Sequence, residues 1–179
     1  MVLCHKSTNQ YDYSFPIVSY SWLNRYPNPY AKHVISVDTL DSSVDEHGKL
    51  HITKLIRKSG SIPSWAKPFL SITDSWIVEK AVIDPATQTM ETYTRNLDHT
   101  GVIRIEEFNN YFFDDKDEKT YVKSSVKFTS AFRQYYGFSI KDKIENWSHS
   151  KFTENIKKSR QGLLLVMQNF QTRRLKNNV

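Results

Sequence analysis

The sequence contains little cysteine, glycine or proline, and each shortage excludes a class of structure. Cys4 is the only cysteine among 179 residues, so neither an internal disulfide nor a cysteine-based metal site can form. Five glycines and six prolines, beside 13% aromatic residues, are typical of a globular chain rather than a disordered one. No apolar run approaches the roughly 20 residues of a transmembrane helix. The first residues, MVLCHKSTNQYDYSF, contain neither a signal-peptide core nor an Arg-rich presequence. We therefore expect one domain, residues 1–179.

Motifs that carry catalytic chemistry are missing as well. The six histidines show no HExxH or similar metal-ligand spacing, and no G-x-S-x-G elbow, Walker loop or glycine-rich dinucleotide loop is present. Asp98 and His99 fall in an expected turn and are better explained as turn residues than as a catalytic dyad. Glu106 and Glu107 are neighbours in an expected strand, so they point to opposite faces. We expect a protein that is not an enzyme and holds no cofactor or metal.

The charge balance favours an anionic partner. Lysine and arginine number 25 against 19 acidic residues, a net charge of +6. Nucleic acid, a membrane surface or an acidic ligand would each fit this excess. The basic residues are spread along the chain, and no RNA-binding aromatic signature or helix-turn-helix pattern accompanies them. By itself the excess of positive charge is a weak signal for any one of them.

Strict alternation of apolar and polar residues dominates the middle of the chain. It predicts strands at residues 34–40, 50–58, 75–83, 89–97, 102–113 and 121–129, with a short further strand at 2–6. Short turn sequences rich in aspartate join these segments, which is typical of antiparallel neighbours. The sequence thus predicts a meander of about seven strands.

Two helices flank this meander. Pro16 and the four-residue spacing of Val18, Trp22 and Tyr26 predict a helix over 15–26, ended by the prolines that follow. Residues 139–176 predict one long helix with Ser139 as its N-terminal cap. Its apolar face carries Phe152, Ile156, Ser159, Leu163, Val166, Met167 and Phe170.

A line of polar residues borders that apolar face, namely Lys151, Asn155, Lys158 and Gly162. One interpretation is a core-packing helix whose lysines reach water. The other is a helix that covers an apolar cavity and directs cations at an anion inside it. A large curved sheet wrapped around one helix leaves such a cavity, so we expect an α+β helix-grip fold with a ligand pocket.

The strand at 50–58 places a further cation beside apolar residues. Leu50, Ile52, Ile56 and Lys58 share one face, so Lys58 would lie at the mouth or floor of the cavity if that face is internal. For any one cation the solvated-surface interpretation is favoured. Convergence of Lys58 with Lys151 and Lys158 would change that, because a buried charge needs a partner that an anionic ligand can supply.

The connection at 59–73 is too long for a tight turn and unusually apolar. Trp65, Phe69 and Leu70 lie there beside Lys67. Either the aromatic residues fold back as a satellite core, or the loop is a lid that inserts apolar side chains into a bilayer while Lys67 meets lipid phosphates.

Several separated stretches of the sequence resemble the PRELI family over essentially the whole chain. They are RYPNPY (25–30), HVISVD (33–38), WAKPFL (65–70), YTRNLDHT (93–100), ENWS (145–148) and KKSR (157–160). The resemblance implies a fold similar to phosphatidylinositol transfer proteins, with a seven-stranded antiparallel sheet and a lidded lipid pocket. It implies head-group contacts from Arg25, His33, Lys58, Lys151, Asn155 and Lys158.

The same resemblance implies roles for the lid and the long helix. The loop around Trp65 would be the lid, with Lys67, Phe69, Leu70 and also Trp147 at the membrane. Acyl chains would lie along Phe152, Ile156 and Leu163 and along the inner face of the sheet. Ser61 departs from the family pattern, where we expect another basic residue after Ser59 and Gly60.

The function implied by the resemblance is transfer of phosphatidic acid between the mitochondrial outer and inner membranes, which supports cardiolipin synthesis. The ligand would be phosphatidic acid, and the location the intermembrane space, peripheral to the inner membrane. The implied partner is a small disulfide-bonded helical-hairpin chaperone that forms a heterodimer with the protein.

Two other classes of function remain open from the residues themselves. A helix-grip enzyme acting on a small ligand would need a perturbed acid or base in a compact pocket. A basic RNA- or membrane-binding module would expose aromatic residues on a strand face, whereas we expect the exposed aromatics in the 59–73 loop.

Overall fold

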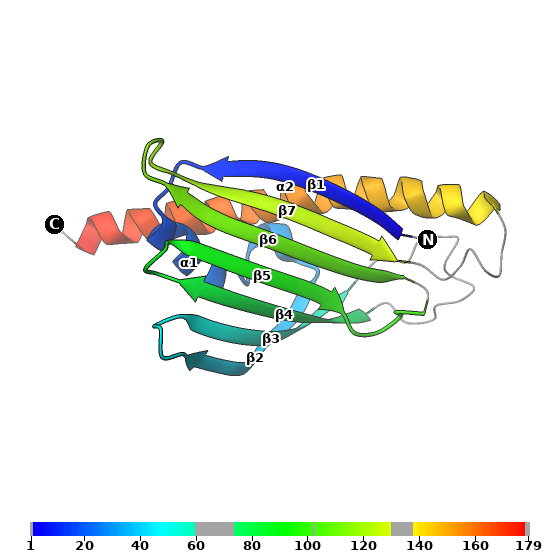
Figure 1. Ribbon diagram of the computed structural model, residues 1–179, viewed down its shortest axis with the longest axis horizontal. Helices are drawn as coiled ribbons and strands as arrows, with labels where there is room; N and C mark the ends of the chain where they lie inside the picture. The colour runs from blue at the N-terminus through cyan, green and yellow to red at the C-terminus, as the bar shows by residue number, and fades with distance from the viewer. Residues whose placement is uncertain (1, 60–73, 102, 130–137, 178–179) are drawn as a thin grey trace.

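A computed structural model describes residues 2–59, 74–101, 103–129 and 138–177. The chain begins with β1 (Val2–Tyr11), α1 (Phe15–Leu23) and a 3₁₀ turn, η1 (Pro29–Ala31). The meander follows as β2 (Val34–Val44), β3 (Leu50–Ser59), β4 (Asp74–Asp84), β5 (Thr89–Asn96), β6 (Arg104–Asp114) and β7 (Lys119–Thr129). The long helix α2 (Phe138–Asn177) completes the fold (Figure 1). No helix in these ranges has both the length and the hydrophobicity needed to cross a membrane.

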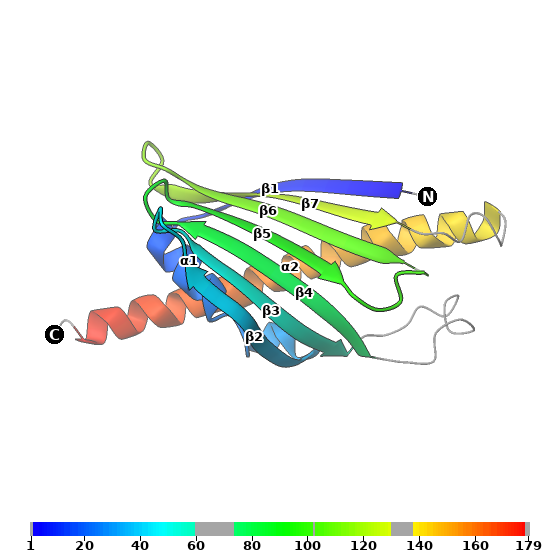
Figure 2. The ribbon, with the colours of Figure 1, turned by 60° about the horizontal axis from the view of Figure 1, so that its bottom comes forward.

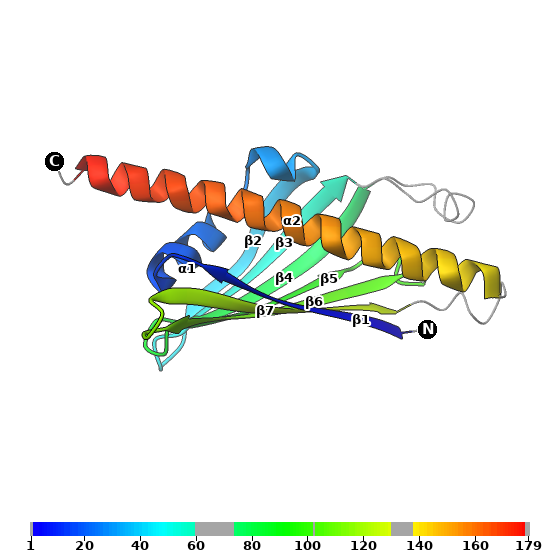
Figure 3. The ribbon, with the colours of Figure 1, turned by 90° about the horizontal axis from the view of Figure 1, so that it is seen from above.

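The strands form one antiparallel sheet in the order β1-β7-β6-β5-β4-β3-β2 (Figure 2). Strands that follow one another in the chain pair side by side from β2 to β7, while β1 closes the other edge by pairing with β7. The curved sheet faces α2, which lies across its inner side (Figure 3). The expected α+β class, with seven strands around a long C-terminal helix, is confirmed.

Several predicted boundaries were wrong. β1 extends to Tyr11 rather than ending at residue 6, because it pairs with β7 along its whole length. β2 extends to Val44, past two register shifts. α1 ends at Leu23 rather than 26, where the Trp22 carbonyl accepts hydrogen bonds from the backbone N–H and the guanidinium of Arg25. α2 begins at Phe138, so Ser139 lies inside its first turn rather than capping it.

The strand register sorts the inner face of the sheet into rows. At one end, the row Leu50, Ile83, Met90, Tyr111 and Val122 is apolar. Phe15, Val18 and Trp22 of α1 and Leu163 and Met167 of α2 pack on this end and form the hydrophobic core. Fully burying a large apolar side chain contributes about 1.5–3 kcal/mol, so these contacts fix both helices against the sheet. The opposite end of the inner face, where Lys58 pairs with Ser75, lies outside the core.

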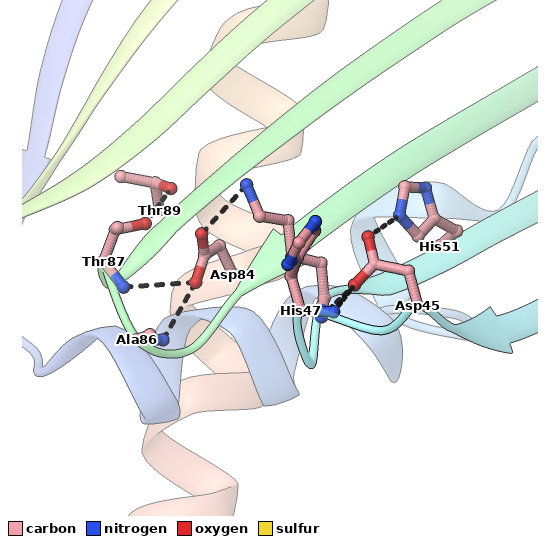
Figure 4. Close-up of polar contacts among 8 residues, drawn as sticks. Asp45, His47, His51, Asp84, Ala86, Thr87 and Thr89 are labelled. Atoms are coloured by element: carbon pink, nitrogen blue, oxygen red, sulfur yellow. Dashed lines mark hydrogen bonds and ion pairs between the residues drawn. The ribbon is translucent and has the colours of Figure 1, made fainter.

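Aspartates organise the hairpin turns at the core end of the sheet (Figure 4). One carboxylate oxygen of Asp45 accepts hydrogen bonds from the N–H groups of His47 and Lys49, both at 2.9 Å, and the other lies 2.8 Å from His51 Nε2. Gly48 completes this turn with a φ of 79°, a conformation that favours glycine. Asp84 likewise accepts from the N–H groups of Ala86 and Thr87. These aspartates close two hairpins, β2–β3 and β4–β5.

Asp45→Asn should lower the thermal stability at pH 7 and lose its effect in acid. The hydrogen bond from His51, with those from the backbone, lowers the pKa of Asp45 to about 2. A carboxyl whose pKa falls on folding stabilises the fold above its unfolded pKa, and this stabilisation is lost as the pH falls towards 2. Melting curves followed by circular dichroism should therefore show the two proteins converging between pH 4 and pH 2. An unchanged difference in melting temperature at pH 2 would contradict this role.

Candidate functional site

A cavity of about 590 Å³ lies between the inner face of the sheet, the segment around η1 and the helix α2. Its volume is within the range usual for ligand pockets in proteins. It occupies the space that the hydrophobic core leaves at the other end and in the middle of the sheet. The predicted cavity under the long helix is therefore present.

All six predicted head-group residues line this cavity, namely Arg25, His33, Lys58, Lys151, Asn155 and Lys158. They come from three parts of the chain: the segment around η1, the end of β3 and the middle of α2. The face of β3 that carries Lys58 is the inner one, which meets the condition under which Lys58 was expected at the cavity. The fold thus brings these side chains to one cavity, although their contact with a lipid stays a prediction.

Three lysines and one glutamate form a charged group on the cavity wall, called here the rim cluster: Lys58, Lys151, Glu154 and Lys158. Glu154 joins the two helix lysines, with Oε2 3.0 Å from Lys151 Nζ and Oε1 2.6 Å from Lys158 Nζ. Hydrogen bonds from Lys158 and Lys151 lower the pKa of Glu154 to about 2. Three ammonium groups against one carboxylate leave the cluster with two positive charges in excess.

His33 lies beside the rim cluster. Its carbonyl accepts the Ser59 N–H at 2.8 Å, which holds the residue against the end of β3. Burial, and then the charges of Lys58, Lys158 and Lys151, lower the pKa of its imidazole below 6.5, and Glu154 opposes them. At neutral pH the ring is therefore uncharged. Among the described residues, the Lys58 ammonium group makes no ion pair with a carboxylate.

Arg25 differs from the other predicted head-group residues because its guanidinium already has a carboxylate partner. It is buried, forms an ion pair with Glu79 of β4, and donates to the Trp22 carbonyl at 2.9 Å. The centroids of the Trp22 and Tyr26 rings lie 4.2 and 4.6 Å from Cζ of the Arg25 guanidinium. Burial alone would lower its pKa, but Glu79 and Tyr26 outweigh burial and raise it. Arg25 is a charged structural group in the cavity wall as well as a candidate ligand contact.

The cavity wall also contains residues that the sequence analysis did not single out, among them Tyr26, Glu154 and Arg160. Burial alone would raise the pKa of the Tyr26 phenol, but the charges of Arg25 and Lys58 outweigh burial and lower it. Arg160 lies near Tyr11, where burial raises the tyrosine pKa to about 12 and the Arg160 charge partly offsets it. The sequence does indicate the contacts of Glu154. It follows Lys151 by three residues and precedes Lys158 by four, and side chains at these spacings meet on a helix.

The inner face of the sheet is more polar than expected for acyl-chain contact. Its middle rows carry Glu79, Thr92, Thr94, Glu107, Asn109 and Ser124, all of which line the cavity. The amide of Asn109 donates to Thr92 Oγ1 at 3.1 Å and to Glu107 Oε1 at 3.0 Å. Acyl-chain contact along the inner sheet stays a prediction, and the polar rows were not foreseen because alternation defines a face but not the polarity of each row.

The apolar part of the cavity wall lies on α2 and at the far end of the sheet. Ile156 and Leu163 line it, as predicted, together with Ile77, Ile105 and Phe128. The side chain of Phe152, and the lid residues Trp65, Lys67, Phe69, Leu70 and Ser61, lie outside the described part of the chain. Their roles stay predictions.

Trp147 lines the cavity and packs edge-on against Phe128, with the ring centroids 6.3 Å apart. It is half-buried. Its predicted contact with a membrane stays a prediction.

The outer face of the sheet carries aromatic residues that we expected only in the 59–73 loop. Phe108 is 49% exposed and lies 4.8 Å from the Tyr93 ring, measured between centroids. The Tyr93 hydroxyl donates to Glu106 at 2.9 Å.

Glu106 and Glu107 point to opposite faces of β6, as predicted. Glu106 accepts the hydrogen bond from Tyr93 on the outer face, and Glu107 lines the cavity.

A close contact between Gly162 of α2 and Asn28, the residue before η1, limits how closely these two elements can approach. A Cβ atom at Gly162 would lie 2.8 Å from Asn28 Oδ1. Asn28 has little freedom to withdraw, because its amide donates to the Arg25 carbonyl at 2.6 Å and its Oδ1 accepts from the Tyr30 N–H at 2.9 Å. The absence of a side chain at Gly162 thus allows α2 to lie close to the segment that carries Arg25 and His33.

Gly162→Ala should lower the free energy of unfolding although alanine is the better helix former. In an Asn28→Ala background the clash is absent, and the same substitution should raise the free energy of unfolding by about 1 kcal/mol, the usual difference between glycine and alanine in a helix. Urea denaturation of the four proteins measures both effects. Equal effects of Gly162→Ala in the two backgrounds would show that the contact with Asn28 does not restrain the helix.

The architecture and the cavity together define a helix-grip protein with a charged ligand pocket. A solved structure of the same fold is the Zhui aromatase/cyclase of Streptomyces sp. R1128, with a TM-score of 0.59 over 95% of this chain and 96% of that chain. At 9% identity this likeness shows the fold alone.

The PRELI-like family matches residues 17–173, and the chain belongs to that family. It is 50% identical to the protein UPS1, mitochondrial, of Saccharomyces cerevisiae over 97% of this chain and 98% of that protein. It is 38% identical to the ups1 homologue of Schizosaccharomyces pombe over 87% of this chain and 89% of that protein.

Proposed function

We propose that the protein is a mitochondrial lipid transfer protein that carries phosphatidic acid and has no catalytic step. The observation that carries this proposal is the convergence of Lys58, Lys151 and Lys158 on one cavity that also has an apolar wall. A ligand with an anionic head and apolar chains satisfies both parts of this surface. Family membership, and the mitochondrial relatives by name, support the location.

The charge of the rim cluster supports a phosphomonoester as the head group. Its two excess positive charges match a phosphomonoester, which carries a charge of roughly −1.5 to −2 at pH 7 because its second pKa is near 6. A phosphodiester carries a single negative charge and would leave the cluster partly uncompensated. Phosphatidic acid is the membrane phospholipid whose head group is a phosphomonoester without a substituent.

The finer parts of the proposal concern direction and partner. We place transfer between the outer and inner mitochondrial membranes, in the intermembrane space and peripheral to the inner membrane, where it would support cardiolipin synthesis. The proposed partner is a small disulfide-bonded helical-hairpin protein. Resemblance to the PRELI family supports these assignments.

Lys58→Glu and Lys158→Glu should each reduce transfer of phosphatidic acid between vesicles by at least about tenfold, which corresponds to about 1.4 kcal/mol of lost binding. Each variant places a carboxylate where the lipid phosphate would lie. Transfer is measured with fluorescent phosphatidic acid in phosphatidylcholine donor vesicles and unlabelled acceptor vesicles. Melting temperatures establish that the variants are folded.

Lys80→Glu is the matched control, because Lys80 is exposed on the opposite face of β4 and the charge change is the same. Its transfer rate should stay within about twofold of the wild type. Wild-type rates in the folded Lys58 and Lys158 variants would overturn the head-group assignment.

The pKa of the His33 imidazole should rise when phosphatidic acid binds. The lysine charges that help to lower its pKa would be neutralised by the phosphate, so the imidazole pKa should rise towards or above 6.5. Nuclear magnetic resonance titration of the ring protons, assigned with a His33→Gln variant, measures the pKa with and without lipid. A fall in the pKa on binding would mean that the phosphate does not approach the rim cluster.

A further inference from the structure

The acidic member of the rim cluster has no part in the head-group contacts proposed above. Glu154 lies on α2 between Lys151 and Lys158, and each of its carboxylate oxygens takes one ammonium group, at 3.0 and 2.6 Å. All three side chains line the cavity. The two donors that a lipid phosphate would use on α2 are therefore already bound to an anion of this chain.

A carboxylate and a phosphate present the same kind of acceptor to a lysine. Both are anionic oxygens that form charge-assisted hydrogen bonds with ammonium groups. While Lys151 or Lys158 is bound to Glu154, one of its three N–H donors is used, and the carboxylate charge repels a phosphate that approaches the same ammonium group. Glu154 and the lipid phosphate must therefore compete for these donors.

We propose that Glu154 is an internal counter-ion, which occupies Lys151 and Lys158 in the empty protein, yields them to the phosphate of an incoming lipid, and returns to them as the lipid leaves. This proposal deepens the proposed function and rests on it. In this proposal Glu154 speeds the release of the lipid, because it rebinds the lysines that the departing phosphate frees.

The exposure of these side chains suits such an exchange. The side chains of Glu154 and Lys158 are 42% and 50% exposed, so the displaced carboxylate turns into water rather than into a buried site. Ion pairs in this setting are weak, and breaking them opposes uptake only modestly. The carboxyl remains ionised at physiological pH, because Lys158 and Lys151 lower its pKa to about 2. Glu154 therefore carries the negative charge that competes with the phosphate throughout the physiological pH range.

Glu154→Gln tests this role, because glutamine keeps the shape of the side chain and removes its charge. Two quantities are measured: the fraction of phosphatidic acid that the protein extracts from phosphatidylcholine vesicles, and the rate at which the loaded protein delivers it to acceptor vesicles. We expect binding about two- to fivefold tighter and a release rate lower by a similar factor, since the weak ion pairs with Glu154 no longer have to be broken when the phosphate binds.

Glu91→Gln is the matched control, because Glu91 is exposed on β5 and its loss changes the net charge by the same amount. It should bind and release phosphatidic acid as the wild type does, which separates the site from general attraction to anionic vesicles. Weaker or unchanged binding in Glu154→Gln would overturn the proposal, and weaker binding would identify Glu154 as a residue that positions the lysines. Failure of the wild type to extract phosphatidic acid in preference to phosphatidylcholine would instead overturn the proposed function.

Discussion

The buried ion pair between Arg25 and Glu79 holds the segment after α1 against the middle of the sheet, and the cavity depends on this attachment. Without it, the chain from Tyr26 to His33 would lose its anchor on β4. Removing one partner of a buried pair leaves an uncompensated charge and typically costs about 3–5 kcal/mol. A substitution of Arg25 would therefore change stability and ligand binding together, whereas the half-exposed lysines of the rim cluster can be changed with less effect on the fold.

The strand register places the residues that pack the helices at one end of the inner face and the residues that line the cavity on the rest of it. One end packs α1 and α2 through apolar rows, and the remainder faces the cavity with polar middle rows and a second apolar row beyond them. The contact between Gly162 and Asn28 then sets how closely α2 approaches the η1 segment. Core, register and this contact together determine that cations from β3 and from α2 face one cavity.

Much of this arrangement could be predicted from local patterns. Period-two alternation located the strands, because side chains of a strand alternate between faces, and it placed Lys58 at the end of an inward row. Helical spacing placed Lys151, Asn155 and Lys158 on one border of α2. What local patterns could not give were pairings between distant residues. Arg25 and Glu79 are 54 positions apart, so nothing in either segment showed that the arginine already has a partner. The polar middle rows were missed for a similar reason, since a row crosses strands that are separate in the sequence.

The partial exposure of the rim cluster suits a protein that must release its ligand, whereas a fully buried cationic site would not. A site made of three unpaired, fully buried ammonium groups would be costly to form, because each charge loses its hydration. It would also hold a dianion too tightly to exchange it between membranes. Here two lysines share one carboxylate and remain partly in water, and the neighbouring imidazole is uncharged when the site is empty. The empty state is therefore stable by itself. At Lys151 and Lys158 a bound phosphate would gain only the difference between a phosphate and a carboxylate, and Lys58 would add one contact that Glu154 does not occupy. A small difference of this kind is what reversible transport requires.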